Sequence, residues 1–217
     1  MLCLCSLAEV LLVRFVNPPF TTSMVYNRLC GKTQTTQEGL WPEQTWRPLH
    51  DVSAHLIRAV QAAEDQRFVF HHGFDFEEMN NALKDLLTGR RVRGASTISM
   101  QAARTVFLWP SRSLLRKSLE AYYTVLIELL WGKRRILEVY LNTVDWGVGI
   151  VGAEAAARKY FKVSASSLSP SQAALLAAIL PSPHTWSPLD PSEFVRERQR
   201  KIMVDMERMP AGRFRKR

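Results

Sequence analysis

Cysteine is scarce in this chain of 217 residues, and all of it lies near the beginning. Cys3, Cys5 and Cys30 are the three cysteines, so residues 31–217 contain none. Three thiols cannot form a closed disulfide framework. The core is therefore not cross-linked, which is compatible with either the cytosol or the periplasm.

Glycine and proline are also few, at 10 and 11 residues, which excludes a collagen-like or low-complexity protein. Apolar residues make up 47% of the chain and charged residues 23%. This is ordinary globular composition, and it excludes a disordered chain. The length corresponds to one large domain or two small ones.

A long hydrophobic run is missing as well. Residues 1–16 are apolar, but Glu9 and Arg14 interrupt them, and a spanning helix needs about 20 apolar residues. No basic segment precedes the stretch and no small-residue cleavage site follows it, so a cleaved signal peptide is not expected. Two interpretations remain: the end of a membrane anchor whose beginning is missing, or an amphipathic helix lying on a membrane or on the core. In both, Pro18 and Pro19 end the helix.

Acidic residues are outnumbered, because 29 Lys and Arg against 20 Asp and Glu leave a net charge of +9. From Lys84 to Arg135 there are eleven basic and three acidic residues, so 11 − 3 = +8 lies in this basic belt. Such an excess suggests an anionic partner, which is a nucleic acid, an anionic membrane surface or a phosphorylated ligand. A solvated basic face is the plainer alternative.

The remaining pattern predicts a mainly α-helical protein with no strand of useful length. Helices are predicted at 55–65, 76–88, 96–107, 113–131, 134–141, 152–161, 170–180 and 191–209. The helix at 113–131 has the strongest apolar face, formed by Leu115, Leu119, Tyr122, Tyr123, Leu126, Leu129 and Leu130. Residues 17–50 are predicted as an irregular leader and residues 210–217 as a basic tail.

Four segments combine many polar residues with otherwise apolar helices: EDQRFVFHHGFD at 64–75, GASTISMQ at 94–101, RKSLE at 116–120 and ILEVYLN at 136–142. The first lies where one helix ends and the next begins, a common place for catalytic groups. The second places glycine and hydroxyls at a helix N-terminus, which favours an anion. The third places Glu120 one helical turn after Arg116.

Each feature has an ordinary explanation when it is taken alone. A glutamate at the end of a helix is usually solvated, and Arg116 with Glu120 forms a common helical ion pair. His71 and His72 resemble part of a zinc site, but no third ligand follows at metal spacing, so no metal site is predicted. Taken together, two glutamates on different helices, the basic belt and an anion site suggest acid/base chemistry on a phosphorylated substrate.

These four segments, in this order and spacing, resemble the motifs of the peptidoglycan glycosyltransferases. They are most similar to the monofunctional biosynthetic peptidoglycan transglycosylases of Gram-negative bacteria. The resemblance covers about residues 9 to 209 and continues through Trp146-Gly147, GAEAAA at 152–157, Tyr160-Phe161 and AAILPSP at 177–183. It departs from the usual family pattern at Arg104, Gln172 and Trp146, where Lys, Glu and Phe are more common.

The resemblance implies a lysozyme-like helical fold with a large lobe and a membrane-proximal jaw lobe, here over residues 51–209. It implies polymerisation of lipid II, with inverting transfer from an undecaprenyl-pyrophosphate-linked chain to the 4-hydroxyl of a GlcNAc. By position, Glu64 matches the general base and Glu120 the second glutamate, at the donor site. The expected substrate contacts, matching or neighbouring the family's, are Asp65, Ser96, Thr97, Gln101, Arg104, Arg112, Arg116 and Lys117.

The resemblance also sets expectations about cofactors, partners and location. No cofactor is required, although a divalent cation, Mg or Mn, is compatible with the pyrophosphate site. The partners are lipid II, the growing glycan chain, the membrane and other cell wall synthesis or division proteins, and not nucleic acid. The place is the bacterial inner membrane, with the catalytic domain facing the periplasm. No Ser-x-x-Lys motif occurs, so transpeptidase activity is not expected.

Two other functions compete with this one. A lytic hydrolase of the same fold would use Glu64 as a general acid toward a glycosidic oxygen. It has no need of the basic belt, because its leaving group carries no phosphate. A non-enzymatic binder of nucleic acid or anionic membrane would keep its affinity after the loss of Glu64.

Overall fold

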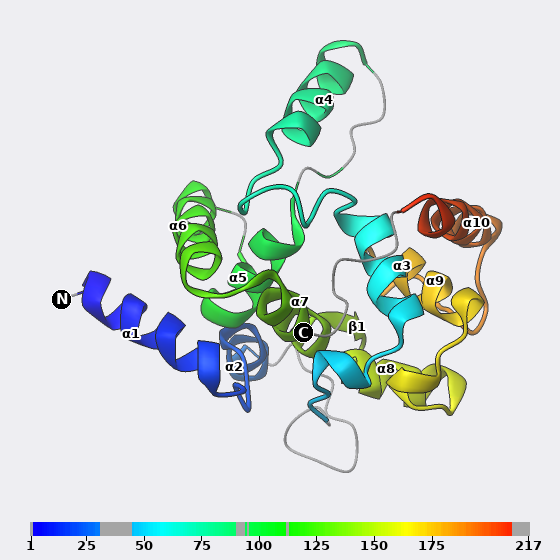
Figure 1. Ribbon diagram of the computed structural model, residues 1–217, viewed down its shortest axis with the longest axis horizontal. Helices are drawn as coiled ribbons and strands as arrows, with labels where there is room; N and C mark the ends of the chain where they lie inside the picture. Colours follow the sequence, from blue (N-terminus) through cyan, green and yellow to red (C-terminus); the bar gives the residue numbers. More distant parts are fainter. Residues whose placement is uncertain (1, 31–44, 90–93, 95, 112, 210–217) are drawn as a thin grey trace.

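The computed structural model describes residues 2–30, 45–89, 94, 96–111 and 113–209 (Figure 1). This part of the chain is mainly helical, as predicted. The helices are α1 (Leu2–Phe15), α2 (Thr22–Leu29), α3 (Ala54–Glu64), α4 (Phe76–Leu87), α5 (Ile98–Phe107), α6 (Leu114–Leu130), α7 (Lys133–Thr143), α8 (Ala153–Phe161), α9 (Pro170–Ile179) and α10 (Glu193–Arg208). Short 3-10 turns lie at Leu49–Asp51 and Ala165–Ser167. The strands β1 (Asp145–Gly147) and β2 (Ile150–Val151) form one irregular antiparallel pair.

Two groups of helices share one hydrophobic core. On one side α9 packs against both α3 and α10, and on the other α5 packs against both α6 and α7 (Figure 1). The small side chains of α9 permit close approach on two faces, since Ala173, Ala174, Ala177 and Ala178 are all fully buried. The packing brings the end of α3, the first turns of α5 and Arg198 of α10 together around Glu64.

Side-chain caps define where several helices begin, and they correct two predicted starts. The Ser169 hydroxyl and the Gln172 amide form the predicted capping box at α9. Thr97, not Ser96, caps α5, since its hydroxyl accepts from the N–H of Met100. In α10 the cap is Ser192, so the proline expected in its first turn precedes the helix.

The segment expected as an irregular leader contains α2, which the sequence pattern missed. Thr21 caps this short helix through the N–H of Met24, and Met24 is buried. α2 packs against α5, so a tertiary contact supplies the stability that its weak pattern does not show. The part of the leader at residues 31–44 lies outside the described residues.

Helix α6 buries a different face from the one its leucines suggest. The buried side chains are Arg116, Glu120, Thr124 and Ile127, whereas Leu129 is 76% exposed. A face of polar residues is buried because Arg116 and Glu120 neutralise each other and the Thr124 hydroxyl donates to the Glu120 carbonyl. The predicted apolar face borders this buried strip: Leu119, Tyr123, Leu126 and Leu130 pack against the core while partly buried, and Leu115, Tyr122 and Leu129 are exposed.

Helix α1 lies on the body with one side and leaves the other side open. Val10 and Val13 enter the core, and the Trp131 indole donates to the Val10 carbonyl at 2.9 Å. Leu12 and Phe15 on the opposite side are exposed. This matches the amphipathic interpretation of residues 1–16. Among the described helices, none combines the length and the apolar character that crossing a membrane requires.

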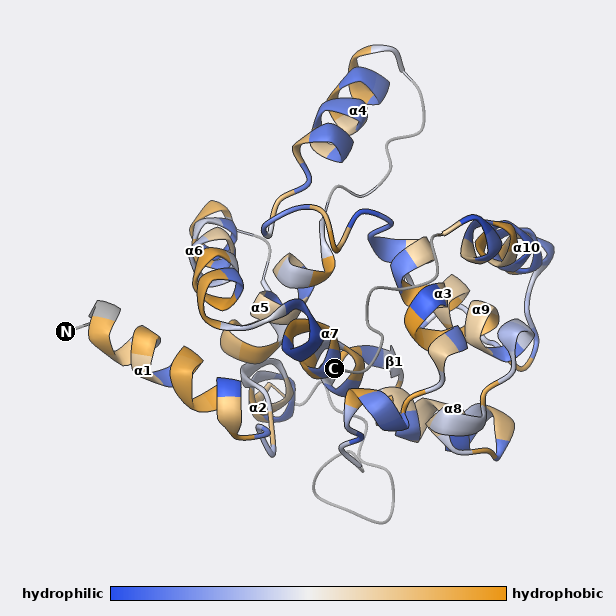
Figure 2. Ribbon diagram, viewed as in Figure 1, coloured by the Kyte–Doolittle hydropathy of each residue, from blue (hydrophilic) through white to orange (hydrophobic). Residues whose placement is uncertain are grey.

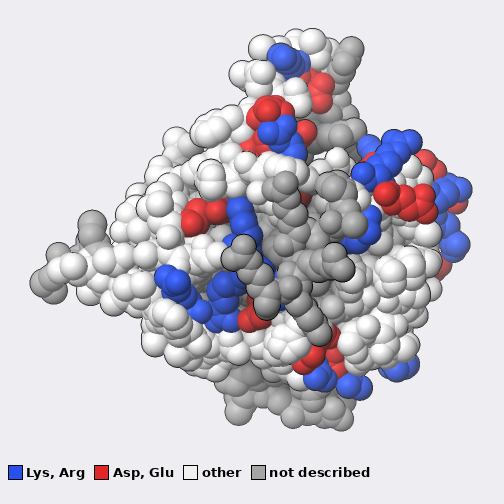
Figure 3. Space-filling model, viewed as in Figure 1, with Lys and Arg blue, Asp and Glu red and all other residues white. Residues whose placement is uncertain are grey.

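An apolar surface runs over three helices on one side of the molecule. It comprises Leu4, Leu12 and Phe15 of α1, Phe76, Leu83, Leu86 and Leu87 of α4, and Leu114, Leu115, Val125 and Leu129 of α6. In Figure 2 α1 and α6 are largely orange, whereas α4 alternates between orange and blue, and in Figure 3 the projecting α4 carries charges of both signs. Helix α4 projects from the body, and none of its described side chains is buried (Figure 1).

Candidate active site

Glu64 is the last residue of α3, and its carboxylate lies where α3, α5 and α10 meet. Its side chain is only 14% exposed, so one edge alone reaches solvent. The Gln101 side-chain amide donates to Oε2 at 2.9 Å. This hydrogen bond joins the first two motifs, at 64–75 and 94–101, by a direct contact.

The orientation of the Gln101 amide is set from α7. The Tyr140 hydroxyl donates to the Gln101 carbonyl oxygen at 3.3 Å, which leaves the amide nitrogen directed at Glu64. Burial and the nearby charge of Glu64 raise the pKa of Tyr140 well above its ordinary value. Tyr140 is therefore a permanent donor in this chain of contacts.

Two arginines surround the Glu64 carboxylate from different helices. Arg198 of α10 places an amino group 3.5 Å from Oε1. Arg104 of α5 is exposed and close enough to act on Glu64 through its charge. Arg104 was predicted as a site residue, whereas Arg198 was not, because α10 carries no motif that marks it.

Burial raises the pKa of the Glu64 carboxyl above its ordinary value, and Asp65 adds to the rise. The hydrogen bond from Gln101 and the charges of Arg198 and Arg104 oppose it. A carboxylate with a raised pKa holds a proton more strongly than a solvated one, so it is a better general base near neutral pH. This combination of burial, fixed orientation and one open edge is what proton removal from a hydroxyl requires.

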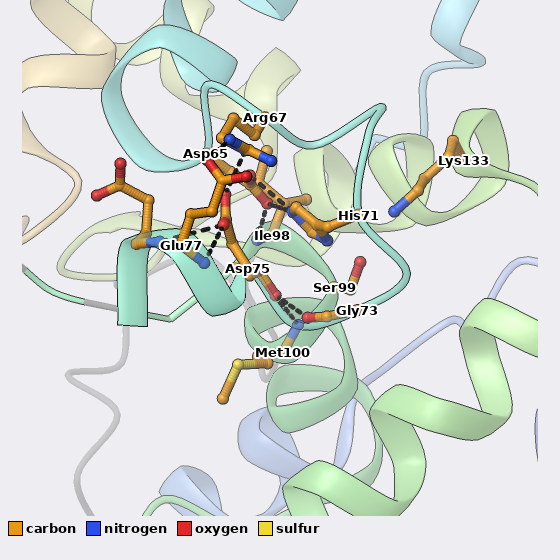
Figure 4. Close-up of polar contacts among 12 residues, drawn as sticks. Asp65, Arg67, His71, Gly73, Asp75, Glu77, Ile98, Ser99, Met100 and Lys133 are labelled. Atoms are coloured by element: carbon orange, nitrogen blue, oxygen red, sulfur yellow. Dashed lines mark hydrogen bonds and ion pairs between the residues drawn. The ribbon is translucent and has the colours of Figure 1, made fainter. Parts of the chain in front are cut away.

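Asp65 is buried, and its side chain joins the first two motifs inside the protein (Figure 4). Its oxygens accept from the N–H of Ile98 at 3.0 Å and contact the His71 ring at 2.9 Å and 3.0 Å. Asp75 caps α4 through the N–H groups of Glu77 and Glu78. The predicted contact of Asp65 with substrate stays a prediction.

Asp65, His71 and Asp75 bring ligand atoms within 4.8 Å of one another, a grouping that the sequence spacing did not reveal. Both oxygens of Asp65 and one of Asp75 accept hydrogen bonds, whereas Nδ1 of His71 and Oδ2 of Asp75 have no hydrogen-bond partner among the described residues. The Arg67 guanidinium lies 3.3 Å from that Asp75 oxygen (Figure 4). A cation of the chain itself thus balances these acids. These contacts within the chain indicate a structural role for the cluster.

Thr97 also holds the two motifs together. Its hydroxyl donates to the Gly73 carbonyl at 2.6 Å, and the side chain is buried. Gly73 has a φ of +92°, and a Cβ there would lie 2.8 Å from Thr124 of α6, so only glycine fits this turn. Ser96, next to Thr97, is half-buried.

Glu120 lies in a second polar cluster on α6. Its side chain is 1% exposed, and both oxygens are taken, one by Arg116 and one by Lys117. Arg116 is buried with it, so the predicted pair on one helical face is confirmed. Lys117 is exposed and is the member of the pair that faces solvent. The predicted contact at Arg112 lies outside the described residues.

Comparison with known proteins agrees with this arrangement. The family model described as transglycosylase matches residues 31–207. A biosynthetic peptidoglycan transglycosylase of Caulobacter vibrioides is 50% identical over 193 residues, which are 89% of this chain and 81% of that protein. Proteins of the same name from Chromohalobacter salexigens (47% over 208 residues, 96% and 89%) and Bdellovibrio bacteriovorus (47% over 198 residues, 91% and 78%) are also similar. The chain therefore belongs to the transglycosylase family and is a peptidoglycan glycosyltransferase of cell-wall synthesis.

Proposed function

We propose that this enzyme polymerises lipid II and that Glu64 is its general base. The observation that carries the proposal is the Glu64 carboxylate itself, which is nearly buried, held by Gln101 and open at one edge. A sugar hydroxyl is a poor nucleophile, and a carboxylate that takes its proton makes attack on the donor sugar favourable. The acceptor is the 4-hydroxyl of the GlcNAc, and attack inverts the anomeric carbon of the growing chain.

The departing group in this reaction is undecaprenyl pyrophosphate, whose negative charge grows as the bond breaks. Fixed cations stabilise such charge without reorganising. Arg104 and Lys117 are exposed for this purpose, and Arg116 lies beside Lys117. Ser96 lies at the N-terminus of α5, where the helix dipole favours an anion, and Thr97 beside it holds the adjoining turn through the Gly73 carbonyl. Arg112 belongs to the proposed contacts by its position in the sequence.

No cofactor is part of the proposal. The Glu120 oxygens are occupied by Arg116 and Lys117, so the described residues at the proposed donor site offer positive charge rather than a ligand set for a cation. A divalent cation such as Mg or Mn would enter with the pyrophosphate oxygens, as part of the substrate.

An enzyme of peptidoglycan synthesis works in the cell envelope. We further propose that its place is the inner membrane, facing the periplasm, and that the apolar surface of α1, α4 and α6 contacts the lipid. The exposed leucines and phenylalanines there support this, since large apolar surfaces of monomers mark interaction sites. The projecting α4 belongs to the proposed jaw lobe. Other cell wall or division proteins are proposed partners at this membrane.

The test of the proposal is product analysis on purified lipid II. We expect glycan strands and released undecaprenyl pyrophosphate from the wild-type enzyme, and neither product from Glu64→Gln. Gln172→Glu, which keeps the capping box of α9 and lies far from Glu64 in the sequence, is the matched control. Cleavage of preformed glycan without pyrophosphate release would instead identify a hydrolase, and unchanged turnover in Glu64→Gln would remove Glu64 from the mechanism.

A further inference from the structure

Helix α10 reaches the site from the end of the described chain, and Arg198 is the residue that makes the contact. α10 packs on α9 and on α3, the helix that ends at Glu64. The Arg198 guanidinium is anchored, because its Nε donates to the Ala178 carbonyl of α9 at 3.1 Å. With that end fixed, an amino group of the same guanidinium faces Oε1 of Glu64 at 3.5 Å.

The two oxygens of Glu64 are thus held from two helices. Gln101 of α5 donates to Oε2, and Arg198 of α10 faces Oε1. A planar guanidinium suits this task, since it donates in two directions at once without changing shape. A lysine amine at the same place would have to choose between the Ala178 carbonyl and Glu64.

The groups around Glu64 that affect its charge come from several helices. Arg104 of α5 and Arg198 of α10 are positive, and Asp65 beside Glu64 is negative. Tyr140 of α7 stays protonated, as described above. α9 contributes the Ala178 carbonyl and carries no charged side chain along Pro170–Ile179. Arg198 is therefore one of two cations that favour the ionised carboxylate against the cost of burial.

We propose that Arg198 is a positioning residue for the general base: it orients Oε1 of the Glu64 carboxylate, the oxygen that Gln101 does not contact, and keeps that group ionised between turnovers. This rests on the proposed role of Glu64. The orientation matters because the remaining lone pair of the carboxylate must point at the acceptor hydroxyl. A misplacement of a catalytic group by about 1 Å can lower the rate about a hundredfold. The ionised state matters because only a carboxylate can accept the proton.

Steady-state kinetics of lipid II polymerisation as a function of pH test this inference. Arg198→Met keeps the aliphatic part of the side chain and removes its charged head, and we expect a fall in kcat of about tenfold or more with little change in KM. The acid limb of the kcat profile should move to higher pH, because loss of the cation lets burial raise the Glu64 pKa further. Arg198→Lys should leave the acid limb near its wild-type place and restore part of kcat.

The matched control is Arg200→Met on the same helix. Arg200 is exposed and pairs with Glu193 and Glu197, so its loss should leave the acid limb unchanged. Arg198→Gln provides a second uncharged variant that still donates a hydrogen bond to Ala178, for use where Arg198→Met fails to fold. Thermal unfolding of every variant shows which molecules are folded in the assay.

The outcomes separate this inference from the proposed function. An acid limb that stays in its wild-type place in folded Arg198→Met or Arg198→Gln overturns the inference, even where kcat falls, because packing alone would then explain the loss. Activity that persists in Glu64→Gln overturns the general-base role first. A dead Glu64→Gln with an unmoved acid limb in the Arg198 variants leaves the base in place and removes only Arg198.

Discussion

Two buried glutamates in this protein have opposite surroundings. Glu64 at the end of α3 has one full hydrogen bond, from Gln101, and a more distant arginine. Glu154 on α8 has three partners: Arg47 at 2.9 Å, Arg158 at 2.6 Å and the N–H of Ala165 at 2.8 Å. The first region leaves a carboxylate with capacity to accept, and the second leaves none.

The pKa shifts of the two groups follow from that difference. Burial alone would raise the pKa of Glu154, but the hydrogen bonds from Ala165, Arg47 and Arg158 bring it below its ordinary value. For Glu64 burial prevails and the pKa rises. A structural glutamate has hydrogen-bond or ion-pair partners for both of its oxygens, whereas a glutamate that accepts a proton keeps some of its hydrogen-bonding capacity unused. The difference supports the proposed role of Glu64 as a proton acceptor and a structural role for Glu154.

The largest expected effect comes from Glu64→Gln. Turnover should fall by about 10²–10⁴-fold, the usual contribution of a general base. Stability should not fall with it: a carboxyl whose folded pKa is raised stabilises the fold below its unfolded pKa, and this is lost as the pH rises through the folded pKa. At neutral pH the amide variant should therefore melt at the wild-type temperature or above, as calorimetry can measure. A variant that melts well below the wild type would make Glu64 structural, like Glu154.

The next largest effect, from Arg116→Ala, tests whether Glu120 resembles Glu64 or the structural Glu154. Arg116→Ala leaves the buried Glu120 with Lys117 alone, and we expect the free energy of unfolding to fall by about 3 kcal/mol. Chemical denaturation measures this, with Lys201→Ala on the exposed side of α10 as the control. If Arg116→Ala keeps full stability but loses turnover, then Glu120 and its cation belong with the catalytic group.

A smaller effect is expected from Glu154→Gln, which changes the structural glutamate of the comparison. Losing charge-assisted hydrogen bonds should lower the free energy of unfolding by about 2 kcal/mol, while turnover per folded molecule is kept. The loss should also depend on pH. A lowered folded pKa gives stability that is present above the unfolded pKa and is lost as the pH falls through the folded pKa. The difference between wild type and variant should therefore shrink on acidification, and a constant difference would contradict the assignment.

The smallest effect is expected from Tyr140→Phe. It removes a neutral hydrogen bond to Gln101 worth about 1 kcal/mol, so turnover should fall roughly fivefold with the fold intact. Polymerisation kinetics beside the melting temperature would show this. A loss as large as that of Glu64→Gln would mean that Tyr140 itself takes part in proton transfer.

Local signals in the sequence were enough for much of the fold. The helix ending at Glu64 and the capping box at Ser169 were predictable, because each depends on neighbours within one or two turns. The buried face of α6 was not, because a run of leucines normally turns inward. Its polar residues turned inward instead, since Arg116 and Glu120 satisfy each other. Only the packing decides such a case.

The residues of the candidate site also fall into those that local motifs predict and those that depend on tertiary packing. Glu64 and Gln101 were predicted as site residues from motifs on two different helices, and the structure brings the two side chains into contact. Arg198 was missed because its importance comes from the docking of α10 on α3 and not from its neighbours in the chain. The sequence also did not predict the cluster of His71 with Asp65 and Asp75, because three metal-ligating residue types at irregular spacing give no recognisable pattern.

The docking of α10 on α3 and α9 also orders events during biosynthesis. A chain emerges from the ribosome N-terminus first, so α3 with its glutamate appears early and α10 late. Until α10 arrives, the flank of α3 and α9 that it covers stays open to water and to chaperones. Contacts between such distant segments also slow the final folding step. The contact between Arg198 and Glu64 can therefore form only when nearly the whole described chain has been synthesised.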